Sequence, residues 1–485
     1  MPDTSKRKRA TIGILVGLLL AALDGTVVAT AQPRILDELK GFHVYFLIAA
    51  SFMLCQTVSM PIWGRLSDIY GRGRFHLAAV ILLVGGSMLC GTAHSMTALV
   101  SYRAIQGLGA GGMMSLSFTM IADLYDLEER AKMQGAISSV WGIASIIGPM
   151  LGGWITDTWS WRWVFYLNLP VGLVSGILVQ AGWEQRPGQG KGKVDVPGAV
   201  LLALTSAAFL SGFGLAGNKG WLMPETLAGF GATAVLATAL VLVERKTAQP
   251  FIAYDLYRIR LFTTGAATGI CAMVCLFAAV FHIPLLVDGV MGKELQKGGY
   301  MLTCMMLPWM VCSAMTKPLL KRFSYRTLAI MGMILSGSAY AMLSRLDASV
   351  TYGIVIGAMM VLGTGLGLTV APLLIAAQNA VSKERLGAAT SLTQFTRSMG
   401  AAIGLAIMGT LMASAFGGRE PEGIIQFRSK LDPAKLREQV EQLVLGLQYV
   451  FRSAALAAAL GVVLALAIPT GKAAELKMAV PAESS

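Results

Sequence analysis

The chain has 485 residues, of which 55% are hydrophobic and 13% are charged, and its mean hydropathy is +0.65. Soluble proteins carry about 25% charged residues, so this composition excludes a soluble protein and predicts one that lies in a bilayer. The net charge of +13 would suit a nucleic-acid binder. However, Lys and Arg are concentrated in alternate segments between apolar runs, which is the positive-inside pattern of membrane proteins.

Fourteen apolar runs are long enough to cross the hydrocarbon layer as helices. The expected spans are 11–33, 43–63, 76–94, 98–122, 134–157, 163–183, 197–217, 225–244, 262–287, 298–316, 326–344, 351–377, 386–413 and 448–470. With the basic stretch SKRKR in the cytoplasm, both termini are expected on the cytoplasmic side of a bacterial inner membrane. The six cysteines all fall within these spans and predict neither disulfides nor a metal site.

The first span carries a carboxylate, Asp24, within its apolar stretch. The basic start and the small residues at 29–31 also fit a cleaved secretory signal, but an internal acid and the further spans favour a retained helix. At 1.5 Å per residue Asp24 lies roughly 20 Å from the inner face. A charge at that depth marks a functional site by default.

The loop GRLSDIYGRGRF joins the second and third spans on the cytoplasmic side. Gly64 and Gly71 allow a tight turn and close helix approach. Asp68 can accept hydrogen bonds from helix N-terminal amides, and Arg72 and Arg74 lie where cytoplasmic cations are expected. An ordinary positive-inside loop would have a similar composition.

This loop resembles the G-x-L-x-D-x-x-G-R/K-x-R/K motif of the major facilitator superfamily. In that family the Arg that matches Arg72 pairs with an acid at the inner end of the fourth span, where this chain has Asp123. The resemblance therefore implies a cytoplasmic latch formed by Asp68, Arg72, Asp123 and Arg130. LDGTVVATAQPRI resembles the first-span motif of the fourteen-span drug:proton antiporters, with Ala29 and Gln32 replacing the usual Asn and Leu. WRWVFYLNLPVG and RLGAATSLTQFTRSMG are also typical of that subfamily.

The fourth span contains Arg103, about 8 Å below the outer face, where Asp24 is expected at about 10 Å. Pairing with Arg103 would favour the ionised form of Asp24, whereas desolvation would favour its neutral form. Asp24 and Arg103 could therefore act as a switch that responds to protonation. A static ion pair between two helices is the alternative. The superfamily's motif R-x-x-Q-G-x-G-x-G, which in antiporters implies proton coupling, is met by Arg103, Gln106, Gly107, Gly109 and Gly111.

The fifth span contains GIASIIGPMLGG. Pro149 should kink the helix, and Gly148, Gly152 and Gly153 allow a neighbouring backbone to approach. Close packing alone would explain these residues. The stretch also resembles the G-P-x-x-G-G element of the superfamily's exporters, which implies outward transport.

An ungapped shift of 255 residues aligns 112–136 with 367–391, which makes the fourth span equivalent to the twelfth. Repeated halves around a midplane site are common in secondary transporters, although a repeat this weak could be chance. The expected fold is an all-α membrane protein with two six-helix bundles and two extra linking transmembrane helices. The domains are residues 1–190, a linker insertion at 191–258 and residues 259–485, with an amphipathic outer loop at 416–447.

The second half lacks acids in its tenth and thirteenth spans, where it offers Gln394 and Arg397 instead. Dicationic substrates are therefore disfavoured, whereas neutral, monocationic or anionic lipophilic compounds fit. His282 and Asp288 lie near the outer end of the ninth span, and His282 fits either a second proton site or a hydrogen-bonded structural residue. Met and aromatic side chains suit a cavity for varied shapes. The expected lining is Gln106, Met113, Met114, Phe118, Trp141, Phe277, His282, Gln394 and Arg397.

The resemblance implies a proton-coupled antiporter that exports small lipophilic or amphipathic molecules (drug efflux) by alternating access. A dedicated metabolite exporter and a non-transporting scaffold or sensor are alternatives. No phosphate-binding G-x-x-x-x-G-K-[ST] loop is present, so the proton gradient is the expected energy source, with no cofactor and no metal. No enzymatic site is expected, because the four His residues are scattered. The expected partners are a small lipophilic substrate, protons and the bilayer, with a periplasmic adaptor as an open alternative at 416–447. We expect a monomer that binds no nucleic acid.

Overall fold

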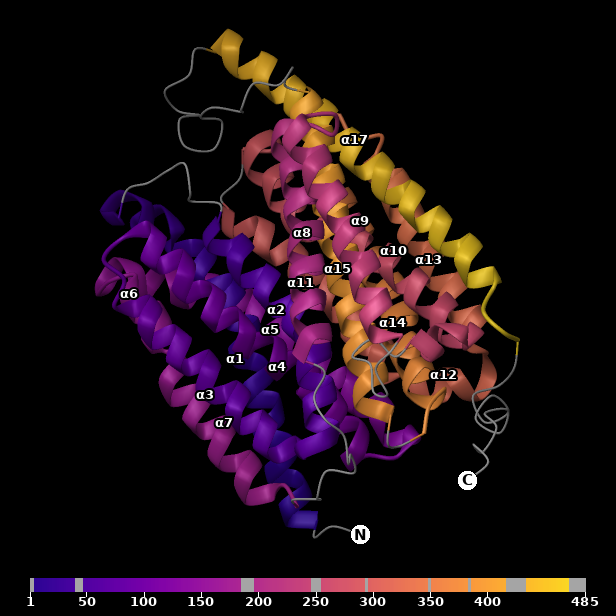
Figure 1. The fold of residues 1–485 in the computed structure, drawn as a ribbon. Helices are drawn as coiled ribbons and strands as arrows, with labels where there is room; N and C mark the ends of the chain where they lie inside the picture. Colours follow the sequence, from indigo (N-terminus) through magenta and orange to yellow (C-terminus); the bar gives the residue numbers. More distant parts are fainter. Residues whose placement is uncertain are drawn as a thin grey trace. The chain divides into compact units, whose positions relative to one another are not determined.

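The computed structural model describes residues 4–39, 47–184, 196–245, 254–292, 295–347, 350–382, 385–415 and 433–470. Within these ranges the regular elements are all helical (Figure 1). The first half contains α1 (Thr4–Leu39), α2 (Leu47–Tyr70), α3 (Arg72–Gly91), α4 (Met96–Leu124), α5 (Leu127–Thr158), α6 (Arg162–Tyr166) and α7 (Asn168–Gly182). Next come α8 (Val196–Lys219), α9 (Pro224–Glu244) and the 3-10 helix η2 (Tyr254–Arg258).

The second half contains α10 (Arg260–Leu285), the π-helical turn η3 (Leu286–Val290), α11 (Leu295–Ala314), α12 (Thr316–Arg322), α13 (Tyr325–Leu343), α14 (Tyr352–Asn379), α15 (Leu386–Ala415) and α17 (Pro433–Leu466). Each of the fourteen runs expected from sequence overlaps a described helix or, for 163–183, the pair α6 and α7. In the described part of the chain, nine helices are long and apolar enough to span a membrane. The count of fourteen spans therefore stays a prediction.

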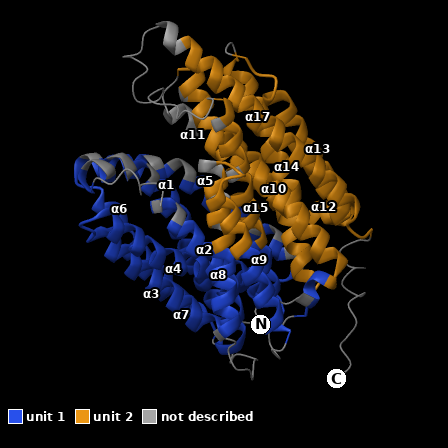
Figure 2. Cartoon of the chain, turned by 45° about the horizontal axis from the view of Figure 1, so that its top comes forward, with its two compact units in different colours: residues 1–207, 233–257, 381–395 blue, residues 208–232, 258–380, 396–485 orange. Residues whose placement is uncertain are grey.

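The chain forms two compact units (Figure 2). The first comprises residues 1–207, 233–257 and 381–395, and the second comprises 208–232, 258–380 and 396–485. The helices α8, α9 and α15 each contribute residues to both units. The three-part division expected from sequence remains a prediction.

Glycines of α4 let two helices approach it from opposite sides. A Cβ on Gly107 or Gly111 would overlap backbone oxygens of α2, whereas a Cβ on Gly109 would overlap the backbone of α3 at Leu83. The R-x-x-Q-G-x-G-x-G stretch is thus a helix with glycines on the face toward α2 and on the face toward α3. Small residues at such positions let membrane helices pack closely.

The second unit repeats this arrangement in α14. There Gly363 and Gly367 face backbone atoms of α11, and Gly365 faces the backbone of α13. By the helix that each glycine meets, Gly111 therefore corresponds to Gly367, which is a shift of 256 residues. The ungapped shift of 255, which pairs Gly112 with Gly367, is one residue out of register in this stretch because it ignores which neighbour each glycine meets.

The last helix, α17, is continuous from Pro433 to Leu466. The amphipathic residues after Pro433 thus belong to the same helix as the last expected span. The rest of the 416–447 loop, residues 416–432, lies outside the described residues.

Candidate functional site

Asp24 of α1 and Arg103 of α4 meet inside the first unit. Nη1 of Arg103 donates to Oδ2 of Asp24 at 2.5 Å, and both side chains are at most 2% exposed. The pairing expected from their matching depths is present. Two opposite charges buried together offset much of each other's desolvation, whereas either alone would be very costly.

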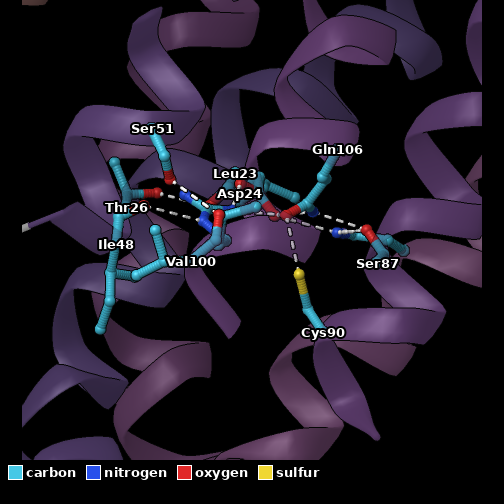
Figure 3. Close-up of polar contacts among 11 residues, drawn as sticks. Leu23, Asp24, Thr26, Ile48, Ser51, Ser87, Cys90, Val100 and Gln106 are labelled. Atoms are coloured by element: carbon cyan, nitrogen blue, oxygen red, sulfur yellow. Dashed lines mark hydrogen bonds and ion pairs between the residues drawn. The ribbon is translucent and has the colours of Figure 1, made fainter. Parts of the chain in front are cut away.

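The other carboxylate oxygen of Asp24 is held by two amides. Gln106 and Asn168 donate to Oδ1 at 2.6 and 3.0 Å, and both amides also donate to the hydroxyl of Ser87, at 2.6 and 2.8 Å. Figure 3 shows Asp24, Gln106 and Ser87 close together. Gln106 accepts in turn from Arg103 at 2.6 Å. Four helices, α1, α3, α4 and α7, thus contribute to one closed polar network.

Aromatic rings surround the guanidinium of Arg103. Its Cζ lies 4.1 Å from the ring centre of Phe52 and 5.9 Å from that of Phe165. Its Nε donates to the carbonyl of Ile48 at 3.3 Å. Ring faces attract a desolvated cation, so these contacts hold the charge away from water.

The sequence did not identify Asn168 and Ser87 as members of this network, and it placed Gln106 in the fourth-span motif and in the expected cavity without pairing it with Asp24. Asn168 lies in the WRWVFYLNLPVG stretch, and a single polar amide near the start of an apolar span could have indicated a site residue. Ser87 gave no comparable signal, because a serine in a span is as often a packing residue.

A second ion cluster lies where α2, α3 and α4 meet. Arg72 pairs with Asp123 and also with Asp68, at 3.2 Å, and it donates to the carbonyl of Thr119 at 3.3 Å. These contacts join three of the four residues of the expected latch, namely Asp68, Arg72 and Asp123. Gly71, which joins α2 to α3, has a φ of 100°, a left-handed conformation that favours glycine.

The carboxylate of Asp68 also meets the first turn of α15. Its Oδ2 accepts the backbone N–H of Ala388 at 3.1 Å, and a Cβ on Gly387 would overlap the carboxylate. The first amides of a helix lack partners within it, so Asp68 acts as their acceptor. Gly64 is similarly constrained, since a Cβ there would overlap the hydroxyl of Ser391.

Burial raises the pKa of Asp68, which lies beyond the second expected span, to about 6. The cation of Arg72 opposes this shift without cancelling it. A carboxylate that normally titrates near pH 4 is thus brought toward neutrality.

Arg130, the fourth residue of the expected latch, and Arg74, a cation of the same loop motif, lie differently. Arg130 stands on α5, and its Nε donates to the carbonyl of Tyr125 at 2.9 Å, so this contact fixes the turn between α4 and α5. Arg74 is exposed. The three-residue core of Asp68, Arg72 and Asp123 is therefore the part of the predicted set that the structure assembles.

In α5, the glycine motif packs directly against α1. A Cβ on Gly148 would overlap the hydroxyl of Thr26, and a Cβ on Gly152 would lie 2.7 Å from the carbonyl oxygen of Val27. Nothing lies within 4 Å of the corresponding point on Gly153. The side chain of Pro149 lies outside the described part. Two of the three glycines therefore fix the stretch of α1 that carries Asp24.

The expected cavity residues of the first unit differ in exposure. Met113 is fully buried, and its methyl group occupies the space beside Gly17 of α1. Met114 and Phe118 are also buried, whereas Trp141 is 37% exposed. Met113 is thus a packing residue in this structure. Gln394 is buried, at 6% exposure.

In the second unit, the ring Nδ1 of His282 lies 3.1 Å from the carbonyl oxygen of Ala278, one turn earlier on α10. This contact matches the structural interpretation of His282. Arg397 is buried and donates to the carbonyl of Val370 at 2.6 Å. Phe277 stacks on Phe281 with ring centres 6.0 Å apart. The side chain of Asp288 lies outside the described residues.

A cavity of about 740 Å³ lies between α3 and α7 and is lined by apolar side chains, glycines and Gln180. It contains none of the predicted cavity residues. No three His, Cys, Asp or Glu side chains come together as a metal site in the described ranges.

Long apolar helices and a buried ion network define a multi-pass membrane protein. The chain belongs to the Major Facilitator Superfamily, whose family model matches residues 14–405. It is 33% identical over 420 residues to Multidrug resistance protein 3 of Bacillus subtilis (strain 168), across 85% of this chain and 82% of the relative. It is 31% identical over 440 residues to the Multidrug transporter protein MdtP of the same organism, across 90% and 81%.

A fungal relative, the Efflux pump FUS6 of Gibberella moniliformis (strain M3125 / FGSC 7600), is 28% identical over 428 residues, across 84% of this chain and 75% of that protein. Among solved structures, the human organic anion transporter MFSD10 (TETRAN) matches 95% of this chain and 99% of its own, with a TM-score of 0.66 at 14% identity. That likeness shows the fold alone.

Proposed function

We propose that this chain is a proton-coupled antiporter of the fourteen-span type, which exports small lipophilic or amphipathic molecules across a bacterial cytoplasmic membrane by alternating access. The observation that carries this proposal is the closed network around Asp24. A carboxylate that binds an arginine and two amides in a dry interior is an expensive arrangement. A purely structural ion pair is weak grounds for keeping it, because apolar packing does as well or better.

The two protonation states of Asp24 give the network two arrangements. The ionised carboxylate attracts Arg103 and accepts from Gln106 and Asn168. A proton on Asp24 removes the attraction to Arg103 and turns one acceptor oxygen into a donor. Protonation therefore changes the forces between α1 and α4, which is what coupling to alternating access requires.

The names of the multidrug relatives support lipophilic drugs as the substrate class. The absence of acids from the tenth and thirteenth expected spans favours monocations, neutral compounds or anions over dications. Outward transport is supported by the resemblance of the GIASIIGPMLGG stretch to the exporter element and by relatives named as a multidrug transporter and an efflux pump.

The test uses purified protein in proteoliposomes that contain a pH-sensitive dye. Tetraphenylphosphonium, chloramphenicol and 8-anilinonaphthalene sulfonate represent the three charge classes and are added under an imposed pH gradient. Proton release evoked in wild type and lost in Asp24→Asn supports antiport. Substrate flux without proton movement would support a uniporter or a dedicated metabolite exporter, and no flux with any compound would favour a scaffold or sensor.

A further inference from the structure

The cavity of about 740 Å³ between α3 and α7 takes no part in the proposed function. These two helices lie side by side in the first unit (Figure 1). The lining comes from the stretch 77–85 of α3 and the stretch 172–181 of α7, and it consists of apolar side chains and glycines apart from Gln180. Ile81 and Ile177 in this lining are 62% and 65% exposed. The cavity is therefore open along the surface, as an α3–α7 groove.

Close packing beneath the α3–α7 groove holds its two walls together. A Cβ on Gly172 of α7 would overlap the side chain of Val84. Nearer the other end, Nε2 of Gln180 donates to the carbonyl of Gly73 at 2.9 Å. Small residues let membrane helices approach in this way. Above these contacts, no described atom lies within 4 Å of the point where a Cβ on Gly85 would stand, so the packing of α3 on α7 leaves a hollow.

The length of the α3–α7 groove matches one leaflet of the membrane. Leu77 and Gly85 are eight residues apart on α3, which corresponds to about 12 Å, and half of the hydrocarbon core is about 15 Å thick. The third expected span begins at residue 76, so the groove lies in the leaflet next to the loop motif. In the proposed orientation this is the cytoplasmic leaflet. Acyl chains fill that layer, and the volume of the groove is within the usual range of ligand cavities, about 300–1,000 Å³.

One end of the α3–α7 groove carries a cation. Arg74, Leu77 and Ile81 follow one another at spacings of three and four residues, so they share one face of α3. Arg74 is exposed and forms no ion pair or hydrogen bond with any described residue. At the same end of α7, the carboxylate of Glu184 is paired with Lys6 at 3.6 Å. The guanidinium of Arg74 therefore stays available for an anion, and its geometry suits a phosphate.

These features define the chemistry of the ligand. It needs a long apolar part for the lining and an anionic group at the end where Arg74 stands, and a phospholipid of that leaflet has both. Basic pockets between membrane helices on the cytoplasmic side bind anionic headgroups. A second copy of the chain fits less well, because a two-fold axis along the membrane normal would bring its Arg74 to the same depth as the first.

We propose that the α3–α7 groove binds one anionic phospholipid, with an acyl chain along the apolar lining and the phosphate at Arg74. The site depends on insertion in a membrane and not on proton coupling, so it stands or falls separately from the proposed function. A zwitterionic lipid carries the same phosphate, but it also brings a positive group toward Arg74. The site should therefore prefer a lipid with a net negative charge.

The experiment separates a lipid site from ordinary contact with bulk lipid. Purified protein in dodecyl maltoside micelles receives phosphatidylglycerol that carries a photoactivatable diazirine in one acyl chain, and peptide mass spectrometry locates the label. Unlabelled phosphatidylglycerol and phosphatidylcholine serve as competitors. Gly85→Leu places a side chain in the hollow without meeting a described atom at its Cβ. The matched control is Gly231→Leu of α9, an exposed helical glycine whose Cβ position is equally open.

The lipid site predicts label in the peptides that contain residues 77–85 and 172–181. Gly85→Leu should lower this label at least tenfold, whereas Gly231→Leu should leave it within twofold of wild type. Label within twofold of wild type in Gly85→Leu would overturn the proposal. So would unlabelled grooves in a wild-type dimer detected by light scattering, because a second copy would then be the occupant.

The charge of Arg74 is tested by the competitors. Phosphatidylglycerol should displace the label at about fivefold lower concentration than phosphatidylcholine, which is the effect of one cation near an anionic lipid. Arg74→Gln should remove this preference, and Arg74→Lys should keep it. Equal displacement by the two lipids in wild type, or an unchanged preference in Arg74→Gln, would overturn the assignment of the phosphate to Arg74.

Discussion

Asp24 is held by one charged partner, Arg103, and by neutral side chains of neighbouring helices. Asp24 and Arg103 are charged residues within apolar runs, and their equal depth from the outer face predicts their pairing. Asn168 and Ser87 carry no charge, and only the packing of α3 and α7 around α1 brings them to the carboxylate. A charged residue within an apolar run can be recognised from the sequence, whereas its neutral hydrogen-bond partners can be identified only from the three-dimensional structure.

The side-chain amide of Asn168 should contribute to the free energy of unfolding as a buried hydrogen-bond donor. Asn168→Leu leaves Oδ1 of Asp24 with one donor in place of two and also removes a donor from Ser87. We expect a loss of about 1–3 kcal/mol in the free energy of unfolding, measured by denaturant titration in mixed micelles. The neighbouring Leu169→Ala is the control, because Leu169 is exposed and should change stability by no more than about 0.5 kcal/mol. Equal effects of the two changes would contradict the network's importance.

The raised pKa of Asp68 predicts a pH-dependent contact with α15. The charged form accepts the Ala388 amide and prevails above pH about 6, and as the pH falls below this value protonation weakens the contact. A cap of this kind is worth about 1 kcal/mol, or roughly fivefold in amide exchange. Deuterium exchange of the peptide that starts at Leu386 should be slower in wild type than in Asp68→Asn at pH 7.5 and equal at pH 5. Because wild type and Asp68→Asn are compared at the same pH, the intrinsic pH dependence of amide exchange cancels. A ratio of the two exchange rates that is the same at pH 7.5 and pH 5 would contradict the titration of Asp68.

At the scale of helices, the sequence located the elements well because apolar runs are long and loops are short. It did not show which glycine meets which neighbour. The stretch from Gly107 to Gly112 reads as one small-residue run, yet Gly107 and Gly111 clear space for α2 while Gly109 clears it for α3. Facing residues depend on helix rotation, which an ungapped alignment of two halves cannot fix to within one residue.

The contact between α1 and α5 predicts different tolerance among three neighbouring glycines. Gly148→Ala and Gly152→Ala should push α5 away from the Thr26–Val27 stretch of α1, whereas Gly153→Ala meets open space. We expect the first two to lose about 1–3 kcal/mol of stability and Gly153→Ala to lose none. Thermal unfolding in detergent checks this. If Gly153→Ala proves as harmful as the other two, the motif does not act through α1.

At the scale of the whole chain, the composition indicated a membrane protein, and the loop motif indicated the superfamily that the family model over residues 14–405 shows. The number of crossings is harder, because nine helices of the described ranges are long and apolar enough to span a membrane, whereas α5, α8 and α11 give only shorter apolar pieces there. The count of fourteen crossings thus stays a prediction from the apolar runs.

The predicted crossing by α8 can be tested directly. Fourteen spans place Glu184 in the cytoplasm and Leu222, which is 87% exposed, outside the cell. A membrane-impermeant maleimide should label a cysteine at Leu222→Cys in intact cells and one at Glu184→Cys only after lysis. The native cysteines lie in apolar helices, and unmodified protein gives the background. Equal labelling of both positions in intact cells would mean that α8 does not cross.

Proton antiport through Asp24 is tested most directly by the proton release that the three-member panel evokes in proteoliposomes, with wild type and Asp24→Asn side by side. We expect release by wild type with at least one compound and at least a tenfold smaller release by Asp24→Asn, because the neutral amide cannot give up the proton on which antiport depends. Equal release by the two proteins would show that Asp24 does not carry the proton and would leave Asp24 and Arg103 as a structural ion pair.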